Sequence, residues 1–261
     1  MVGSTPGTSP LRDAYRKVCD RIAAAAERSG RKAKDVLMVA VTKNATPDQI
    51  RGLVEMGHID LGESRVQQLG QRVAQLNEFL ARHKTLGGAV VAKPNTPAMP
   101  EEVRWHMIGH LQRNKVKQVV PLVKLVHGVD SLRLAEELHN YAARTEQVVD
   151  VLVQVNASGE ASKHGISPPA VPHIVDQIET MLHLRCRGLM TMAPHTDNPE
   201  DARGPFARTA ELFNEIRGEK VGRDGFNILS MGMTNDFEIA IEEGANIVRI
   251  GRALFGETES E

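Results

Sequence analysis

Residues Val36–Lys43 read Val-Leu-Met-Val-Ala-Val-Thr-Lys. Six apolar residues in a row, rich in β-branched types, are too few for an ordinary helix and predict a strand that is buried on both faces. Thr46, Pro47 and Asp48 then supply a helix N-cap, a proline for the first helical position and an acidic residue for the first turn. Lys43 is therefore expected at the carboxyl end of a buried strand, where ligands bind in α/β sheets and barrels.

A lysine in that position has two interpretations. It can be a solvated charge at a strand end, as most lysines beside loops are. It can also be a desolvated amine that forms a Schiff base with an aldehyde. The position of Lys43 alone favours the first interpretation, so the rest of the chain has to decide between them.

Composition limits the classes of function. The chain has 261 residues, of which 41% are hydrophobic and 25% charged, with a formal net charge of −1. This is typical of a soluble globular protein and gives no basic field for nucleic acid or for an acidic membrane. Cys19 and Cys186 form no paired metal-ligand motif and suggest a reducing compartment. Residues 1–10 lack the apolar region of a signal peptide, so a cytoplasmic protein is expected.

Strand and helix patterns alternate along the whole chain. After a first helix at 11–28, eight strand-like segments are each followed by a helical pattern or a short turn. The predicted strands are 36–43, 59–63, 104–108, 124–129, 149–155, 184–190, 227–230 and 247–250. At this length, strict alternation predicts a single α/β domain over 1–261, a (β/α)8 TIM barrel with an N-terminal helix, rather than an open doubly wound sheet. Residues 1–10 are expected to be a tail and 84–101 a loop insertion.

The last two strands end in residues suited to a phosphate group. Ser230, Met231 and the following Gly-Met-Thr stand after the seventh strand, and Gly251 and Arg252 stand after the eighth. Backbone N–H groups at such strand-to-helix turns bind phosphate, and these loops are the frequent phosphate position in barrels of this kind. Opposite a lysine on the first strand, they favour a phosphorylated aldehyde as the ligand.

Arg249 lies inside the apolar eighth strand, two residues before Gly251. It can be a buried charge paired with a carboxylate, as buried charges require partners. It can also be a guanidinium that faces the pyridine nitrogen of a pyridoxal ring. In that place a permanent cation disfavours protonation of the ring nitrogen and weakens the ring as an electron sink.

The chain resembles the family of pyridoxal phosphate homeostasis proteins over nearly its whole length. The motifs that carry the resemblance are Val39–Lys43, Leu61–Glu63, Trp105–Lys115, Gln154–Asn156, Lys163–Gly165, Gly188–Met192, Leu229–Thr234 and Val248–Arg252.

The resemblance implies a barrel like the N-terminal domain of alanine racemase, with pyridoxal 5′-phosphate joined to Lys43 as a Schiff base. It also implies Arg249 near the ring nitrogen. The residues implied around the phosphate are Ser230, Met231, Gly251 and Arg252. Ser64 is a candidate ring contact, at a position where the family usually has asparagine.

Two further sets of residues are candidate sites. Lys163 is either a solvated loop charge or a second amine that accepts or relays the cofactor. His106 and His110 have the spacing of a helical metal pair, but they straddle a strand end, where that spacing does not converge, so no metal site is expected. His106 is instead expected to be packed or hydrogen-bonded.

Two functions remain open on these residues. The first is a non-catalytic protein that buffers or delivers pyridoxal phosphate, with apoenzymes as partners and a monomer or weak dimer as its state. The second is an amino-acid racemase, which needs a base on each face of the substrate carbon. Lys43 can supply one base, but the two tyrosines of the chain, Tyr15 and Tyr141, fall in predicted helices away from the strand ends. The sequence therefore favours the carrier.

Overall fold

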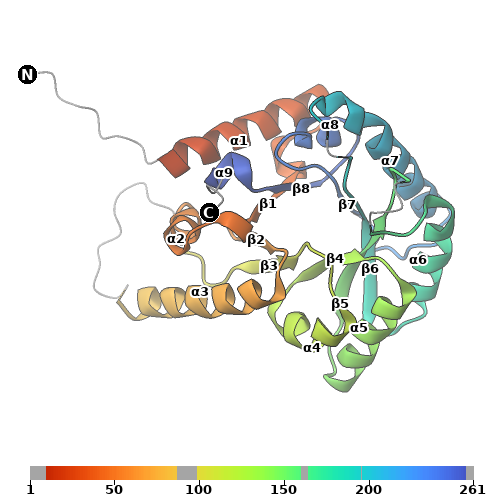
Figure 1. Ribbon diagram of the computed structural model, residues 1–261, viewed down its shortest axis with the longest axis horizontal. Coiled ribbons are helices and arrows are strands. Elements are labelled where there is room, and N and C mark those ends of the chain that lie inside the picture. Colours follow the sequence, from red (N-terminus) through yellow and green to blue (C-terminus); the bar gives the residue numbers. More distant parts are fainter. Residues whose placement is uncertain (1–9, 87–98, 160–163, 195, 257–261) are drawn as a thin grey trace, which may run out of the picture.

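Eight parallel strands form a closed barrel in the order β1 to β8 in the computed structural model, which describes residues 10–86, 99–159, 164–194 and 196–256 (Figure 1). Each strand pairs with the next, and β8 pairs with β1, so the ring has no free edge. The strands are β1 (Leu37–Val41), β2 (Asp60–Glu63), β3 (Arg104–Met107), β4 (Leu125–Val129), β5 (Val149–Val155), β6 (Leu184–Thr191), β7 (Ile228–Ser230) and β8 (Ile247–Ile250). The predicted TIM barrel is confirmed.

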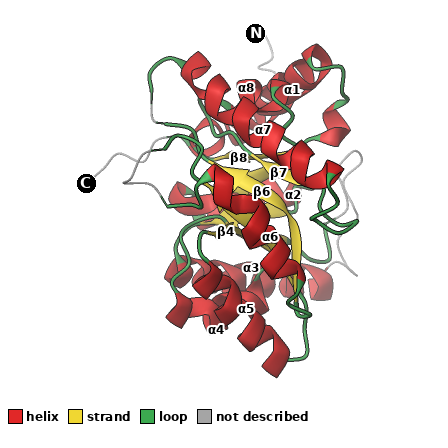
Figure 2. Cartoon of the chain, turned by 90° about the vertical axis from the view of Figure 1, so that its right-hand side faces the viewer, coloured by secondary structure: helices red, strands yellow, loops and turns green. Residues whose placement is uncertain are grey.

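Helices surround the strands on the outside of the ring, and the sheet lies between them in the side view (Figure 2). The helices are α1 (Pro10–Arg28), α2 (Pro47–Glu55), α3 (Val66–Leu86), α4 (Val116–Val119), α5 (Leu132–Arg144), α6 (Val171–Glu179), α7 (Arg203–Gly218), α8 (Phe237–Glu242) and α9 (Arg252–Phe255). Among the described residues, no helix is both long enough and apolar enough to cross a membrane.

The start of α2 shows how local sequence builds these elements. Thr46 accepts a hydrogen bond from the Gln49 N–H at 3.2 Å, and the Gln49 side chain accepts one from the Thr46 N–H at 2.8 Å. This reciprocal capping box satisfies two backbone donors at the helix end, and Pro47 occupies the first helical position. The predicted start of this helix, with Thr46 as the N-cap and Pro47 at the first helical position, is thereby confirmed.

Apolar side chains fill two regions of the barrel. A large cluster lies between the strands and the helices, and it holds most of the buried aliphatic residues. A smaller cluster fills part of the interior of the ring and contains Val39, Leu125, Leu152, Met190 and Ile247. Polar residues occupy the rest of the interior, and they form the site described below.

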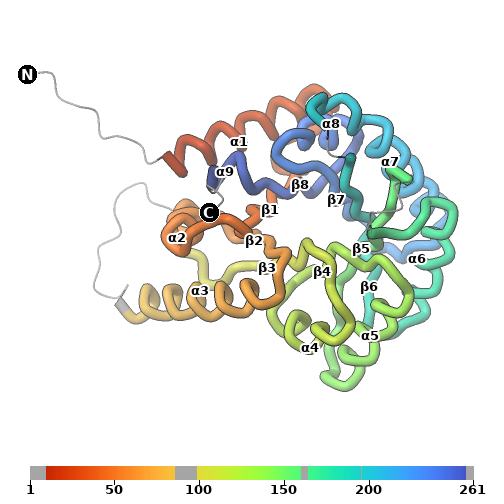
Figure 3. The backbone as a smooth tube through the Cα atoms, in the orientation of Figure 1, coloured from red at the N-terminus to blue at the C-terminus, as the bar shows by residue number. Residues whose placement is uncertain are grey.

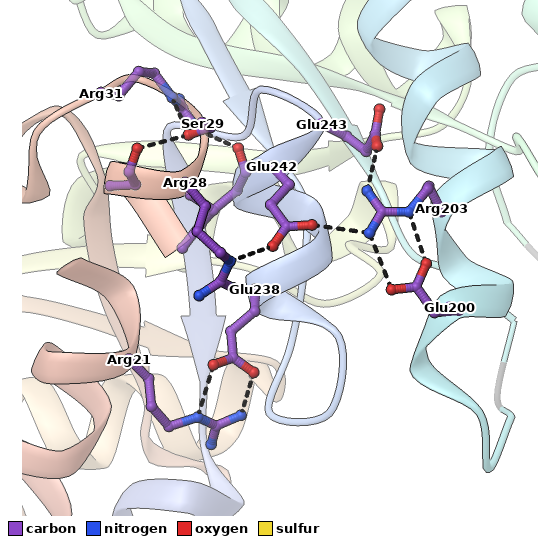
Figure 4. A network of polar contacts seen from close by, with 11 residues as sticks. Arg21, Arg28, Ser29, Arg31, Glu200, Arg203, Glu238, Glu242 and Glu243 are labelled. Carbon is purple, nitrogen blue, oxygen red and sulfur yellow. Dashed lines mark hydrogen bonds and ion pairs between the residues drawn. The ribbon is translucent and has the colours of Figure 1, made fainter. Parts of the chain in front are cut away.

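The N-terminal helix lies against the last elements of the chain, so that the red and blue ends of the tube run side by side (Figure 3). Arg21 pairs with Glu238 and Arg28 pairs with Glu242, each at 2.8 Å (Figure 4). Arg31 donates to the backbone carbonyls of Ile241 and, at 2.9 Å, Ala245. These contacts join α1 to α8 from the outside of the barrel.

Three predicted boundaries were wrong. The first strand ends at Val41, because Thr42–Asn44 form a 3-10 turn. The expected loop at 84–101 begins too early, since α3 continues to Leu86; residues 87–98 and the expected tail, except Pro10, lie outside the described residues. The helix expected near Gln112 is replaced by two 3-10 turns around the short α4, and Pro121, which has no N–H to donate, lies in the second turn.

Candidate functional site

A cavity of about 580 Å³ opens at the carboxyl ends of the strands. Its lining brings together five of the residues proposed from the sequence, namely Lys43, Ser64, Arg249, Gly251 and Arg252. They come from the ends of β1, β2 and β8, which are neighbours in the ring. The lining also contains Met192, Ala193 and Pro194 after β6, and Met233 and Thr234 after β7.

Lys43 lies in the 3-10 turn Thr42–Asn44, not in the strand itself. The turn carries Lys43 past the end of β1 to the lip of the barrel, and the residue is exposed. Of the two interpretations of Lys43, the exposed position fits the solvated charge at a strand end and not an amine desolvated by the surrounding protein. The predicted position at the mouth of the barrel is correct, and the amine is accessible to a ligand that enters the cavity.

Two side chains, the buried Glu63 and the half-buried Arg72, hold the turn that carries Lys43. Glu63 is completely buried at the end of β2, where its carboxylate accepts hydrogen bonds from Thr42, from backbone N–H groups and from Arg72. The second nitrogen of the Arg72 guanidinium donates to the carbonyls of Lys43 and Ala45, both at 3.3 Å. Burial lowers the pKa of Arg72, and the Glu63 carboxylate counteracts the shift. We call Glu63 and Arg72 the turn clamp.

Arg249 reaches the cavity from β8 and is 3% exposed. Its guanidinium donates to the Ser230 hydroxyl at 2.6 Å and to the Thr191 carbonyl at 2.9 Å. Burial lowers the pKa of Arg249 to about 10, and the negative charge of Asp236 opposes the shift. Arg249 is therefore cationic at neutral pH. Asp236 lines the same cavity, which corresponds to the expectation that a buried arginine needs a nearby carboxylate.

A chain of hydrogen bonds continues from Arg249 through the barrel interior. The Ser230 hydroxyl lies 3.0 Å from His127 Nδ1, and His127 Nε2 lies 3.0 Å from His106 Nδ1. His106 Nε2 lies 3.1 Å from Asp60, which also accepts from Arg104 at 2.6 Å. We call Ser230, His127, His106 and Asp60 the interior relay.

The direction of the interior relay follows from its two ends. Arg249 can only donate, so the Ser230 hydroxyl accepts from it and has its own proton available to donate to His127 Nδ1. His127 then carries its proton on Nε2 and donates to His106, which donates to the Asp60 carboxylate. Burial, helped by the neighbouring His106 and Arg249, lowers the pKa of His127 well below its ordinary value, consistent with a neutral ring.

Two residues proposed for the phosphate do not line the cavity. Ser230 is completely buried and its hydroxyl belongs to the interior relay, while Met231 is also completely buried. The helices that follow these strand ends, α8 and α9, have six and four residues. Their dipoles are small, so phosphate binding at this end would depend mainly on nearby N–H groups and on Arg252.

Comparisons with known proteins show which family the chain belongs to. The family model for the alanine racemase N-terminal domain matches residues 19–259. The pyridoxal phosphate homeostasis protein of Aquifex aeolicus is 37% identical over 245 residues, which cover 92% of this chain and 95% of that protein. This chain belongs to the pyridoxal phosphate homeostasis protein family.

Solved structures extend the family comparison. A crystal structure of an unknown protein from Bifidobacterium adolescentis is 35% identical with a TM-score of 0.80, and the match covers 96% of this chain and 98% of that one. PipY of Synechococcus elongatus with pyridoxal phosphate bound is 27% identical with a TM-score of 0.67, over 92% of this chain and 100% of PipY. A protein that is similar to this chain over nearly its whole length thus has a structure that contains the cofactor.

Of the remaining residues, one lies outside the described part of the chain, two have partners that the structure shows, and two were not predicted from the sequence. Lys163 lies outside the described residues. His106 is buried and hydrogen-bonded, as expected, whereas His110 pairs with Asp130 and not with His106. Arg72 and His127 were missed, although a histidine inside the predicted strand 124–129 was a visible signal of a polar barrel interior.

Proposed function

We propose that this protein binds pyridoxal 5′-phosphate in the cavity at the carboxyl ends of the strands and takes part in intracellular homeostasis of the cofactor. The observation that carries the proposal is that an exposed lysine, Lys43, and a buried arginine, Arg249, line one cavity of about 580 Å³. In the proposal, Lys43 is the covalent anchor for the aldehyde and Arg249 faces the ring nitrogen. Gly251 and Arg252 receive the phosphate, and Ser64 lies beside the ring.

The cavity fits such a ligand chemically. A phosphate needs a cation and backbone donors, which Arg252 and the turn at Gly251 offer. A pyridine nitrogen needs a donor, which the Arg249 guanidinium offers. When bound, the cofactor supplies a reactive aldehyde and a ring that can accept electrons. The permanent charge of Arg249 opposes protonation of the ring nitrogen and so weakens the ring as an electron sink.

We propose a carrier rather than a racemase. Racemisation requires a second base on the far side of the substrate carbon. Tyr15 lies on α1, where its hydroxyl is 3.4 Å from His58, and Tyr141 lies on α5. Neither of the chain's two tyrosines lines the cavity. In the carrier proposal, the protein holds the cofactor in the cytoplasm and releases it to apoenzymes that depend on pyridoxal phosphate.

Absorbance of the protein after incubation with pyridoxal phosphate tests the binding site. The wild-type protein is expected to show a visible band of lysine-bound cofactor, and Lys43→Ala is expected to lose it. Lys34→Ala is the matched control, because Lys34 is an exposed lysine in the 3-10 turn that precedes β1, at the opposite end of the strand from Lys43. An unchanged band in Lys43→Ala would refute the assigned anchor.

Two activity measurements separate the carrier from the racemase. The loaded protein is expected to activate a defined apoenzyme. Free cofactor at the same final concentration is the reference. Chiral analysis of alanine and other amino acids incubated with the loaded protein is expected to show no sustained conversion. Steady racemisation that depends on Lys43 would reject the carrier.

A further inference from the structure

We propose that His110, Asp130 and His164 form a binding site for a divalent transition-metal ion, with Zn²⁺ as the best match. His110 follows β3, Asp130 follows β4, and His164 lies in the connection between β5 and α6. Because β3, β4 and β5 are consecutive in the ring, their carboxyl ends bring the three side chains to one rim of the barrel. The site does not depend on the proposed binding of pyridoxal phosphate.

The distances within this three-residue site suit a tetrahedral ion. Asp130 Oδ2 lies 2.9 Å from His110 Nδ1 and 3.6 Å from His164 Nδ1. One ligand atom from each residue can be chosen so that all three lie within 4.8 Å of one another. Zinc bonds of 2.0–2.2 Å at tetrahedral angles place neighbouring ligand atoms about 3.3–3.6 Å apart. Small side-chain movements therefore suffice to bind the ion.

The two histidine rings are already oriented for a common partner. Their centroids are 4.1 Å apart and their planes differ by 15°, so the rings are stacked and each directs Nδ1 toward the same carboxylate. The Asp130 side chain is only 10% exposed, whereas those of His110 and His164 are 42% and 61% exposed. An ion can therefore reach the two histidines from solvent and bind the Asp130 carboxylate, which is nearly buried.

The backbone on each side of the site has little freedom to move. A Cβ on Gly109 would come within 2.4 Å of the Ser64 carbonyl oxygen, so the chain before His110 is packed directly against a neighbouring loop. Gly165 has a φ of +131°, and a Cβ there would lie 2.8 Å from the Asn156 nitrogen. Gln154 also donates to the His164 carbonyl at 3.0 Å. The backbone that carries the ligands is thus held in position before an ion arrives, and only the side chains need to move.

The donor set selects the class of metal. Two imidazole nitrogens and one carboxylate suit zinc and neighbouring transition metals, whereas calcium and magnesium require mainly oxygen ligands. Three protein ligands leave one tetrahedral position open. His110 and His164 both line the cavity that contains Lys43, so a bound ion would lie at the cavity rim.

Cobalt provides a direct test, because tetrahedral Co²⁺ has visible absorption bands and competes for zinc sites. The full-length, untagged protein is titrated with Co²⁺ in the absence of pyridoxal phosphate, and Zn²⁺ is then added. We expect saturable visible bands that Zn²⁺ abolishes. His164→Ala and Asp130→Asn are each expected to weaken Co²⁺ binding about 100-fold or more.

The matched control is His173→Ala, which removes a histidine on α6 that is hydrogen-bonded to Gln177 outside the site. This control is expected to bind Co²⁺ like the wild-type protein, and circular dichroism checks that all variants fold. Absence of the bands in the folded wild-type protein would overturn the proposal. Wild-type affinity in both site variants, or an equal loss in His173→Ala, would also overturn it.

Discussion

The Arg249 guanidinium is a cation inside the barrel, and its hydrogen bonds determine the protonation of the residues beside it. Because Arg249 can only donate and the Asp60 carboxylate can only accept, the interior relay is satisfied when each member donates to the next, and the series ends on Asp60. Burial raises the pKa of Asp60, but hydrogen bonds from His106 and Arg104 lower it below its ordinary value overall. A carboxylate thus terminates the series that begins at a cation.

The neutral state of His127 should appear in the pH dependence of stability. Its pKa in the folded protein is well below the ordinary value of 6.5. As the pH falls below 6.5, the His127 side chain therefore binds a proton in the unfolded chain but not in the folded protein. This stability is fully present above pH 6.5 and is lost as the pH falls from there toward the folded pKa. Between pH ~7.5 and ~5.5, His127 should account for a loss of about 1.4 kcal/mol in the free energy of unfolding.

Urea unfolding at several pH values measures this contribution. His127→Gln should show a shallower fall in stability toward acid than the wild-type protein. His173→Gln, which alters an exposed histidine, should follow the wild-type curve. Equal pH dependence in His127→Gln and wild type would contradict a buried neutral His127.

Among secondary-structure elements, the 3-10 turn after β1 is the one on which the site depends. The turn clamp connects three elements, because Glu63 ends β2, Arg72 lies on α3, and the carbonyl groups it binds belong to the turn. The ion pair is buried, with side-chain exposures of 14% for Arg72 and 0% for Glu63. Loss of Arg72 would leave the buried Glu63 carboxylate without its counter-ion.

Arg72→Met is therefore expected to lower the free energy of unfolding by about 3–5 kcal/mol. Arg65→Met is the control, since Arg65 is an exposed arginine just before the same helix. Adding Glu63→Gln to Arg72→Met should restore part of the loss, because the double variant has no unpaired carboxylate. If Arg72→Met were as stable as Arg65→Met, the turn clamp would not hold the turn.

Sequence patterns could predict some of these elements and not others. The apolar run before Lys43 and the capping residues after it are local signals, so the strand, the helix and the place of the lysine could all be predicted. Arg72 could not, because its partners depend on how α3 packs on the barrel. The grouping of His110, Asp130 and His164 depends on the closure and register of the ring, which are set by long-range packing. Exposure of Lys43 likewise depends on where the strand stops.

The whole molecule is a closed ring, and the first helix packs across the last elements of the chain. Outside the barrel, Arg203 on α7 continues the ion-pair network from α1 and α8 by pairing with Glu242 and Glu243 at 2.8 and 2.6 Å, and also with Glu200 (Figure 4). Its hydrogen bonds to these carboxylates raise the pKa of Arg203. One cation thus holds three acidic residues together at the surface.

Arg203→Ala is expected to cost about 1 kcal/mol, because the network is partly solvated and exposed pairs contribute little each. The loss should shrink at high salt concentration, which screens the repulsion among the carboxylates. Arg82→Ala removes an isolated pair with Glu78 on α3 and should cost less, roughly 0.3–0.5 kcal/mol. Thermal unfolding at low and high salt concentration measures the loss of stability in both variants. An equal loss in Arg203→Ala and Arg82→Ala would argue against a cooperative network.

The covalent anchor can be located by borohydride reduction of the protein loaded with pyridoxal phosphate, followed by peptide mass spectrometry. At one equivalent of cofactor, the phosphopyridoxyl group is expected on the peptide that contains Lys43, and Lys34→Ala is expected to be labelled to the same extent as the wild-type protein. Labelling of Lys163 or another lysine while Lys43 remains unmodified would contradict it.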